Sequence, residues 1–157
     1  DKKVLVEVKK KYKFYKSQLN QHLEKLNFDK HEILIFCDPY FNYSLDEFQS
    51  TIDSYNNWYN SRDIYFMGFH PKNPANEEEQ EFLVTPSGDM PVVDSDLEYS
   101  MMLIQKFSQL QEASDKLHRI GYYKLWPTGY YQDVVVSRQK TYKRIFGGQN
   151  GNEEKIN

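Results

Sequence analysis

The stretch from Glu32 to Pro71 constrains the fold more than any other part of the chain. It begins with a continuous apolar run over residues 33–37, which ends at the Asp38-Pro39 turn. A short, partly β-branched run of this kind is typical of a strand that is buried on both faces. A second such run covers residues 64–69 and ends at His70-Pro71. The sequence therefore predicts two internal strands in this stretch.

The residues between the two runs have the pattern of an amphipathic helix. Ser44 followed by Glu47 is the sequence of a capping box, in which each side chain accepts a hydrogen bond from the other residue's backbone amide. Apolar residues then recur at helical spacing and form one face: Leu45, Phe48, Ile52, Tyr55 and Tyr59. Two buried strands joined by such a helix form a crossover unit, so we expect the strands to run parallel.

Further elements are expected around this unit. Residues 4–8 alternate as in a strand, and a helix should follow them. Ser95 and Glu98 form a second capping box before two adjoining apolar stripes, which predicts a long helix that runs through Met101, Leu103, Ile104 and Phe107 and is capped by Gly121. With 157 residues, the chain should form a single α/β domain with a mixed, partly parallel sheet and helices on its faces.

The C-terminal part is expected to leave this domain, which we place at residues 1–127. Residues 133–146 have the pattern of a last helix or an extended arm, and the tail after Gly147 has the composition of a disordered segment. We expect residues 128–157 to form an extended C-terminal arm that lies on neighbouring subunits. Its partner-binding side chains would be Arg138, Tyr142, Lys143, Arg144, Ile145 and Phe146.

Composition and motifs argue against several classes of function. The net charge of −3 disfavours nucleic acid as the main partner, because proteins that coat RNA or DNA are usually basic. No apolar run approaches the roughly 18 residues that a transmembrane helix needs. The sequence contains no glycine-rich phosphate loop, nucleophile elbow, paired-cysteine motif or His-x-x-x-His motif, so we predict no cofactor and no metal.

Three polar side chains, Asp38, Asp63 and His70, lie near the ends of the predicted internal strands. Ligands of open α/β sheets bind at the carboxyl ends of strands, so Asp38 and His70 could converge to bind a metal or to move a proton. We favour the alternative that both residues belong to turns where a proline stops a strand, since two residues do not complete a metal site. Cys37, the single cysteine, is expected to be a small core residue in a reducing compartment.

Two segments carry a resemblance to a known family. Residues 45–53 read Leu-Asp-Glu-Phe-Gln-Ser-Thr-Ile-Asp, and residues 68–71 read Gly-Phe-His-Pro. With the order of parts from about Val4 to about His118, they resemble an uncharacterised bacterial and plastid family, the domain of unknown function numbered 1415. Of that family's Ser-Pro-Tyr-Pro motif only Tyr99 is retained, and its Cys-Pro-Phe motif is absent. The resemblance implies a domain that has kept its core, lost its polar motifs and acts through its surface.

These observations lead to three hypotheses of function. The first is a non-catalytic accessory or structural subunit of a large mitochondrial assembly, above all a respiratory-chain or ATP synthase complex, in which it binds other protein subunits, peripheral to the membrane. This hypothesis rests on the lost motifs and on the predicted C-terminal arm. It also rests on the start at Asp1, which is what removal of a targeting segment would produce. The second is a small soluble enzyme or ligand-binding protein that uses His70 and Asp38. The third is a mitochondrial ribosomal protein that binds RNA through residues 9–13 and 138–144. The abundance of Lys, Asn, Gln and aromatic residues indicates an AT-rich genome such as that of a protist.

Overall fold

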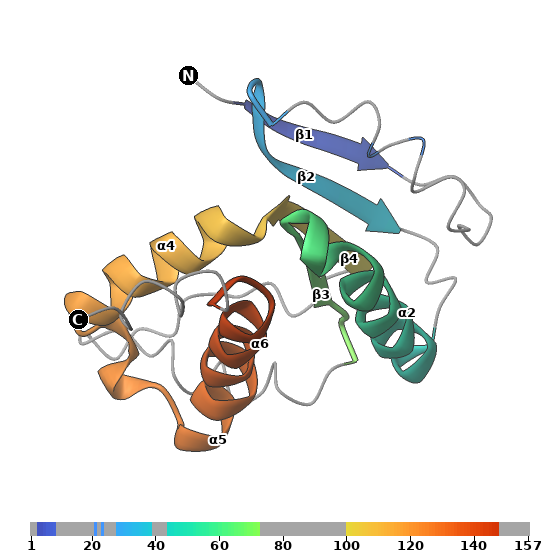
Figure 1. Cartoon of the computed structure of the whole chain (residues 1–157). Coiled ribbons are helices and arrows are strands. Elements are labelled where there is room, and N and C mark those ends of the chain that lie inside the picture. The colour runs from blue at the N-terminus through green and yellow to red at the C-terminus, as the bar shows by residue number, and fades with distance from the viewer. Residues whose placement is uncertain are drawn as a thin grey trace, which may run out of the picture.

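The computed structural model describes residues 3–8, 21, 23, 28–38, 44–72 and 100–147. The described elements are, in chain order, β1 (Lys3–Val8), β2 (His31–Asp38), α2 (Leu45–Tyr59), the 3-10 turn η1 (Asn60–Arg62), β3 (Ile64–Phe69), β4 (Ser100–Lys106), α4 (Phe107–Arg119), the 3-10 turn η2 (Tyr122–Leu125), α5 (Thr128–Tyr131), the π-helical segment η3 (Gln132–Val136) and α6 (Ser137–Phe146). They form one α/β domain, as the sequence predicts (Figure 1).

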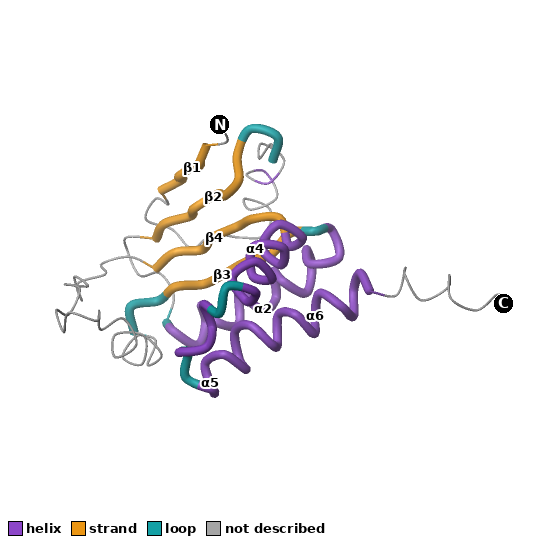
Figure 2. The backbone as a smooth tube through the Cα atoms, turned by 90° about the vertical axis from the view of Figure 1, so that its left-hand side faces the viewer, coloured by secondary structure: helices purple, strands orange, loops and turns teal. Residues whose placement is uncertain are grey.

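The described strands form one sheet with the order β1-β2-β4-β3 (Figure 2). β1 pairs with β2 in parallel, whereas β4 is antiparallel to β2 on one side and to β3 on the other. The two strands of the predicted crossover unit, β2 and β3, therefore point in the same direction. They do not pair with each other, because β4 lies between them, and the unit is a split β-α-β arrangement.

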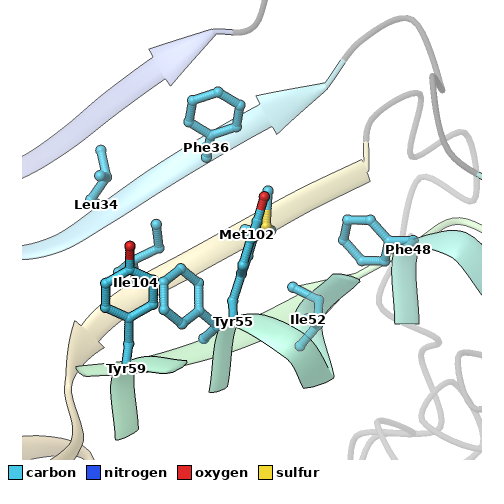
Figure 3. Close-up of a cluster of buried hydrophobic side chains, with 9 residues drawn as sticks. Leu34, Phe36, Phe48, Ile52, Tyr55, Tyr59, Met102 and Ile104 are labelled. Atoms are coloured by element: carbon cyan, nitrogen blue, oxygen red, sulfur yellow. The ribbon is translucent and has the colours of Figure 1, made fainter. Parts of the chain in front are cut away.

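One face of this sheet and the apolar face of α2 form the main core. In register across the sheet, Leu34 of β2 lies opposite Ile104 of β4, which lies opposite Phe66 of β3. Side chains from the sheet and from α2 point toward one another and are almost fully buried (Figure 3); they are Leu34, Phe36, Phe48, Ile52, Tyr55, Tyr59, Phe66, Met102 and Ile104. The predicted buried face of α2 is confirmed for Phe48, Ile52, Tyr55 and Tyr59.

The predicted capping box of α2 is also confirmed. The backbone amide of Glu47 donates to Ser44 Oγ at 3.3 Å, and the backbone amide of Ser44 donates to a Glu47 carboxylate oxygen at 3.1 Å. These bonds satisfy amides that have no partner within the helix. The start of α2 is therefore determined by residues that are close in sequence.

The outer edge of β3 is covered by two asparagine side chains of the preceding helical segment. Asn56 Oδ1 accepts from the Phe66 amide and Asn56 Nδ2 donates to the Phe66 carbonyl, both at 2.9 Å. In the amide orientation that satisfies both of its polar atoms, Asn60 donates to the Ile64 carbonyl at 3.0 Å. An uncovered edge strand can pair with other chains, and these side chains take the place of a further strand.

The prediction of one long helix that includes Met101–Ile104 is wrong, because residues 100–106 form strand β4 and the helix begins only at Phe107. The burial of these residues alternates as in a strand, with Ser100, Met102 and Ile104 almost fully buried. A short apolar run fits a strand or a helix equally well. Residues 100–106 adopt the strand conformation because they lie between β2 and β3, where the backbone of β4 forms hydrogen bonds on both sides.

The prediction of an extended C-terminal arm is wrong for residues 128–146, where the alternative of a last helix holds. Residues 128–146 form a continuous helical run through α5, η3 and α6, and α6 packs against α4 (Figure 1). The rings of Tyr142 and Phe146 lie 5.1 Å and 6.2 Å from the ring of Phe107, the first residue of α4. These apolar side chains find their contacts within the domain, so this part of the chain does not leave it.

Several predictions fall on residues outside the described ranges. They concern the basic cluster at residues 9–13, most of the helix expected after residues 4–8, of which only residues 21 and 23 are described, the second capping box at residues 95–98 and the tail at residues 148–157. Gly121, predicted as a helix cap, is described; its φ of 79° places it in the left-handed region after α4, as expected. None of the described helices combines the length and the hydrophobicity that crossing a bilayer requires.

Helix α2 approaches β3 closely at Gly68, and a substitution there tests this packing. A Cβ atom at this position would lie 2.8 Å from Ile52 Cγ1 and 2.8 Å from Phe48 Cε1, whereas one at Gly129 would have no atom within 4 Å. We expect Gly68→Ala to lower the free energy of unfolding by about 1–3 kcal/mol, because it overpacks the core. Gly129→Ala, the matched control in α5, should raise it by about 0.5–1 kcal/mol. Urea denaturation of both variants measures the difference, and equal stability of the two would contradict the packing described here.

Candidate functional site

His70, the candidate at the end of β3, belongs to the core. It is 4% exposed, its ring lies 5.5 Å from the ring of Phe48, and its Nδ1 atom accepts from the Lys72 amide at 3.2 Å. This is the arrangement of a turn residue, which is the alternative that we favoured from sequence. The side chain of Asp38 lies outside the described set, so its convergence with His70 stays a prediction. Among the described residues no group of three or more His, Cys, Asp or Glu side chains could hold a metal ion.

Asp63, the third candidate, connects the sheet to helix α4. Its Oδ1 atom accepts from the Ser108 amide at 2.7 Å, and its Oδ2 atom accepts from Ser108 Oγ at 2.6 Å. Its backbone carbonyl accepts from the Phe107 amide at 3.0 Å. Lys106, the residue at the N-cap position, makes no side-chain cap, so Asp63 caps α4 from a different part of the chain. The Asp63 carboxylate is therefore engaged in structure.

Asp63→Ala should lower the free energy of unfolding by about 0.5–2 kcal/mol, because α4 loses its cap. Asp63→Asn should cost less, since asparagine keeps one acceptor and tolerates the left-handed backbone, with φ of 60°, at this position. Asp53→Ala is a suitable control because Asp53 is exposed on α2. Thermal and urea denaturation report these changes. An alanine variant as stable as the wild type would show that the cap is not needed.

Cys37 is half-buried on β2, and burial raises the pKa of its thiol. A raised pKa lowers the fraction of reactive thiolate near neutral pH. The residue thus has the properties of a packing residue, as expected from its place in an apolar run.

A different group of polar side chains lies between α4 and α6. Arg138 is only 6% exposed, and its Nη2 atom donates to Ser114 Oγ at 2.9 Å. Ser114 Oγ also lies 3.0 Å from the hydroxyl of Tyr123. Within the described part of the chain, Arg138 forms no ion pair, and Arg138 Nε and Gln111 Oε1 are buried without a hydrogen-bond partner. The guanidinium group is near enough to Tyr65 to oppose the effect of burial, which raises the pKa of that phenol.

A cavity of about 390 Å³ lies beside this group. It is lined from α4, Tyr131, η3 and α6 by Gln111, Ser114, Asp115, His118, Arg119, Tyr131, Val135 and Gln139. The hydroxyl of Tyr131 lies 3.3 Å from His118 Nδ1, and Gln111 Nε2 donates to Asp115 Oδ1 at 2.9 Å. The lining thus carries both basic and acidic groups. A second cavity of about 320 Å³ lies between the end of α2 and α6.

A cluster of aromatic rings supports the turn that follows α4. The ring of Tyr123 lies 5.0 Å from that of Trp126 and 5.6 Å from that of Tyr131. The ring of Trp126 stacks on that of Tyr130 at 4.8 Å. Such ring pairs contribute stability beyond the area that they bury. The turn η2 is therefore held by ring contacts with the residues that follow it.

Three large apolar side chains in and just before this turn are exposed: Ile120, Tyr122 and Leu125 are 77%, 49% and 82% exposed. We call them the apolar knob. Tyr122 and Leu125 lie three residues apart in the 3-10 turn η2, and residues with this spacing lie on the same side of such a helix. Exposed basic residues flank the knob in sequence, namely Arg119 and Lys124. The side chain of Lys124 lies beside Gly121, where an added Cβ atom would meet its Cε atom at 3.1 Å.

The partner-binding residues predicted from sequence divide between the inside and the surface of the domain. Arg138 is buried, and Tyr142 and Phe146 pack against Phe107. Lys143 and Arg144 are exposed, and Ile145 lines the second cavity together with Arg144. Sequence reasoning missed the knob, although the run of aromatic residues beside a glycine is a visible signal for an ordered turn.

Comparison with known proteins gives no family for this chain: no family model, no curated protein and no solved structure matches it.

Proposed function

We propose that this protein is a non-catalytic accessory subunit that binds another protein through the apolar knob. The observation that supports the proposal is the exposure of Ile120 at the C-cap of α4 and of Tyr122 and Leu125 in the turn η2 that follows. Exposed apolar side chains that occur singly are ordinary, but a group of them is characteristic of an interaction site. A few buried residues contribute most of the binding energy in protein interfaces, and tyrosine and arginine are enriched among them.

The charges around the knob suggest the chemistry of the partner. Arg119 and Lys124 are exposed beside the knob and form no ion pair within the described residues. A partner with an apolar groove and carboxylates at its rim would be complementary to this surface, because opposite charges at a rim steer association. We therefore infer that the partner presents an acidic rim.

The mitochondrial setting, with a respiratory-chain or ATP synthase complex as the assembly, is part of this proposal and rests on the sequence alone. The function as an enzyme or ligand-binding protein that uses His70 and Asp38 is less favoured, because the ring of His70 packs in the core against Phe48. The ribosomal function has less support as well. Arg138, one of its basic residues, is buried, and the cluster at residues 9–13 lies outside the described ranges.

The test compares charge substitutions at Leu125 in the full chain, expressed in cells that make the protein. We expect the wild type to migrate on native gels in a species far larger than its own 18.8 kDa. Leu125→Asp should release most of the protein from that species, because the change removes an anchor and opposes the acidic rim. Leu125→Arg should release less, because it removes the same anchor but keeps charge complementarity.

Val4→Asp is the matched control, because Val4 is 52% exposed on β1, away from the knob. It should migrate with the wild type, and all variants should keep the thermal stability of the wild type, since the substituted side chains are exposed. Wild-type protein that migrates as a free monomer would refute the subunit proposal. Equal release by Leu125→Asp and Val4→Asp would refute the role of the knob.

A further inference from the structure

The starting point is the charge of Arg138. Arginine is almost never this deeply buried unless it is paired, because removing a charge from water costs several kcal/mol. The described residues supply Arg138 with one hydrogen bond, from Nη2 to Ser114 Oγ at 2.9 Å, and with no carboxylate. Its Nε atom is buried and has no partner. The domain thus contains a buried positive charge that its own described residues do not neutralise.

Ser114 connects this charge to the cavity of about 390 Å³ between α4 and the C-terminal helices, because Ser114 also lines that cavity. A hydroxyl oxygen can accept two hydrogen bonds while its own proton is donated elsewhere. Ser114 Oγ accepts from Arg138 and lies 3.0 Å from the Tyr123 hydroxyl. When Tyr123 donates, the Ser114 proton is free for an acceptor inside the cavity, and the nearby guanidinium makes that proton a stronger donor.

The rest of the cavity wall provides further donors. Arg119 and His118 line it from α4, and the Tyr131 hydroxyl lies beside His118 Nδ1. The carboxylate in the lining, Asp115, already accepts from the amide of Gln111. Gln111 Oε1 is buried without a partner on the same wall and could accept from a hydroxyl group of a ligand or from an ordered water. The π-helical segment η3 contributes Val135, and such segments frequently occur at functional sites.

We propose that this cavity binds a small oxyanion, a carboxylate or phosphate group, which hydrogen-bonds to Ser114 and Arg119 and neutralises the charge of Arg138. The volume lies in the range of small-molecule sites, so the anion is expected to belong to a small organic molecule. The proposal does not depend on the apolar side chains of the knob, and Ser114 and Arg138 are buried. Arg119 belongs to both surfaces, because it lines the cavity and also lies beside the knob.

The test measures binding of inorganic phosphate and of citrate to the full chain by calorimetry, at constant ionic strength kept with sodium chloride. We expect saturable binding of at least one probe, and the tighter of the two identifies the anion as phosphate or carboxylate. Ser114→Ala and Arg119→Gln should each weaken binding at least ten-fold. Lys140→Gln is the matched control, because Lys140 is exposed on α6 beside Gln139 but does not line the cavity; its affinity should change less than two-fold.

Arg138→Met provides a second readout that does not depend on affinity. It replaces a buried unpaired charge by an apolar side chain, and such replacements are often neutral or stabilising. Without an anion, the variant should melt at or above the wild-type temperature. The wild type should gain thermal stability with added phosphate or citrate, as a bound ligand requires, whereas the variant should gain none.

Two results would overturn the proposal. One is the absence of saturable binding of both probes at millimolar concentrations. The other is an equal loss of binding in Ser114→Ala and Lys140→Gln, which would mean that the probes respond only to the general charge of this surface. Neither result would affect the migration of the Leu125 variants, so failure here is distinguishable from failure of the proposed function.

Discussion

The hydrogen bonds between Asp63 and Ser108 join the sheet to the helical part of the domain, which begins with α4. Asp63 lies directly before the edge strand β3, while Ser108 lies in the first turn of α4, directly after β4. Because β3 and β4 pair in antiparallel register from Ile64 and Lys106 onward, these two positions are adjacent in space. The carboxylate satisfies an amide at the start of α4 and carries a charge that suits a helix N-terminus. The direction in which α4 leaves the sheet, and with it the position of everything built on α4, depends on this junction.

Helices α4 and α6 meet through polar side chains as well as apolar ones. Phe107 packs with Tyr142 and Phe146, which is an ordinary apolar contact between α4 and α6. Beside it lie Ser114 and Arg138, whose burial is costly unless each polar atom finds a partner. Polar atoms that are buried without a partner are rare in folded proteins, so each of them calls for an explanation. In the proposed oxyanion site the anion bonds to Ser114, which also accepts from the guanidinium of Arg138, and the knob begins at the end of the same helix α4.

The resemblance to an uncharacterised family did not lead to a site. The family's Phe-His-Pro tripeptide corresponds to residues 69–71 of this chain. The ring of His70 is buried against that of Phe48, and its Nδ1 atom accepts a hydrogen bond from the Lys72 amide. In this chain the tripeptide accordingly has a structural role at the end of β3. The features that carry the functional proposals lie on α4, η2 and α6, and none of these elements contains a residue of the motifs that carry the resemblance.

Local sequence determined the helix α2 completely: its capping box, its buried face and the strands on both sides of it follow from residues that are neighbours along the chain. The α/β class and the cap at Gly121 could be predicted for the same reason. The strand β4 could not, since the run from Met101 to Ile104 is compatible with either structure until β2 and β3 offer hydrogen bonds on both sides. Likewise, no local pattern shows that Arg138 points inward to Ser114 or that Asp63 caps a distant helix. These contacts join residues far apart in sequence, and only the tertiary structure brings them together.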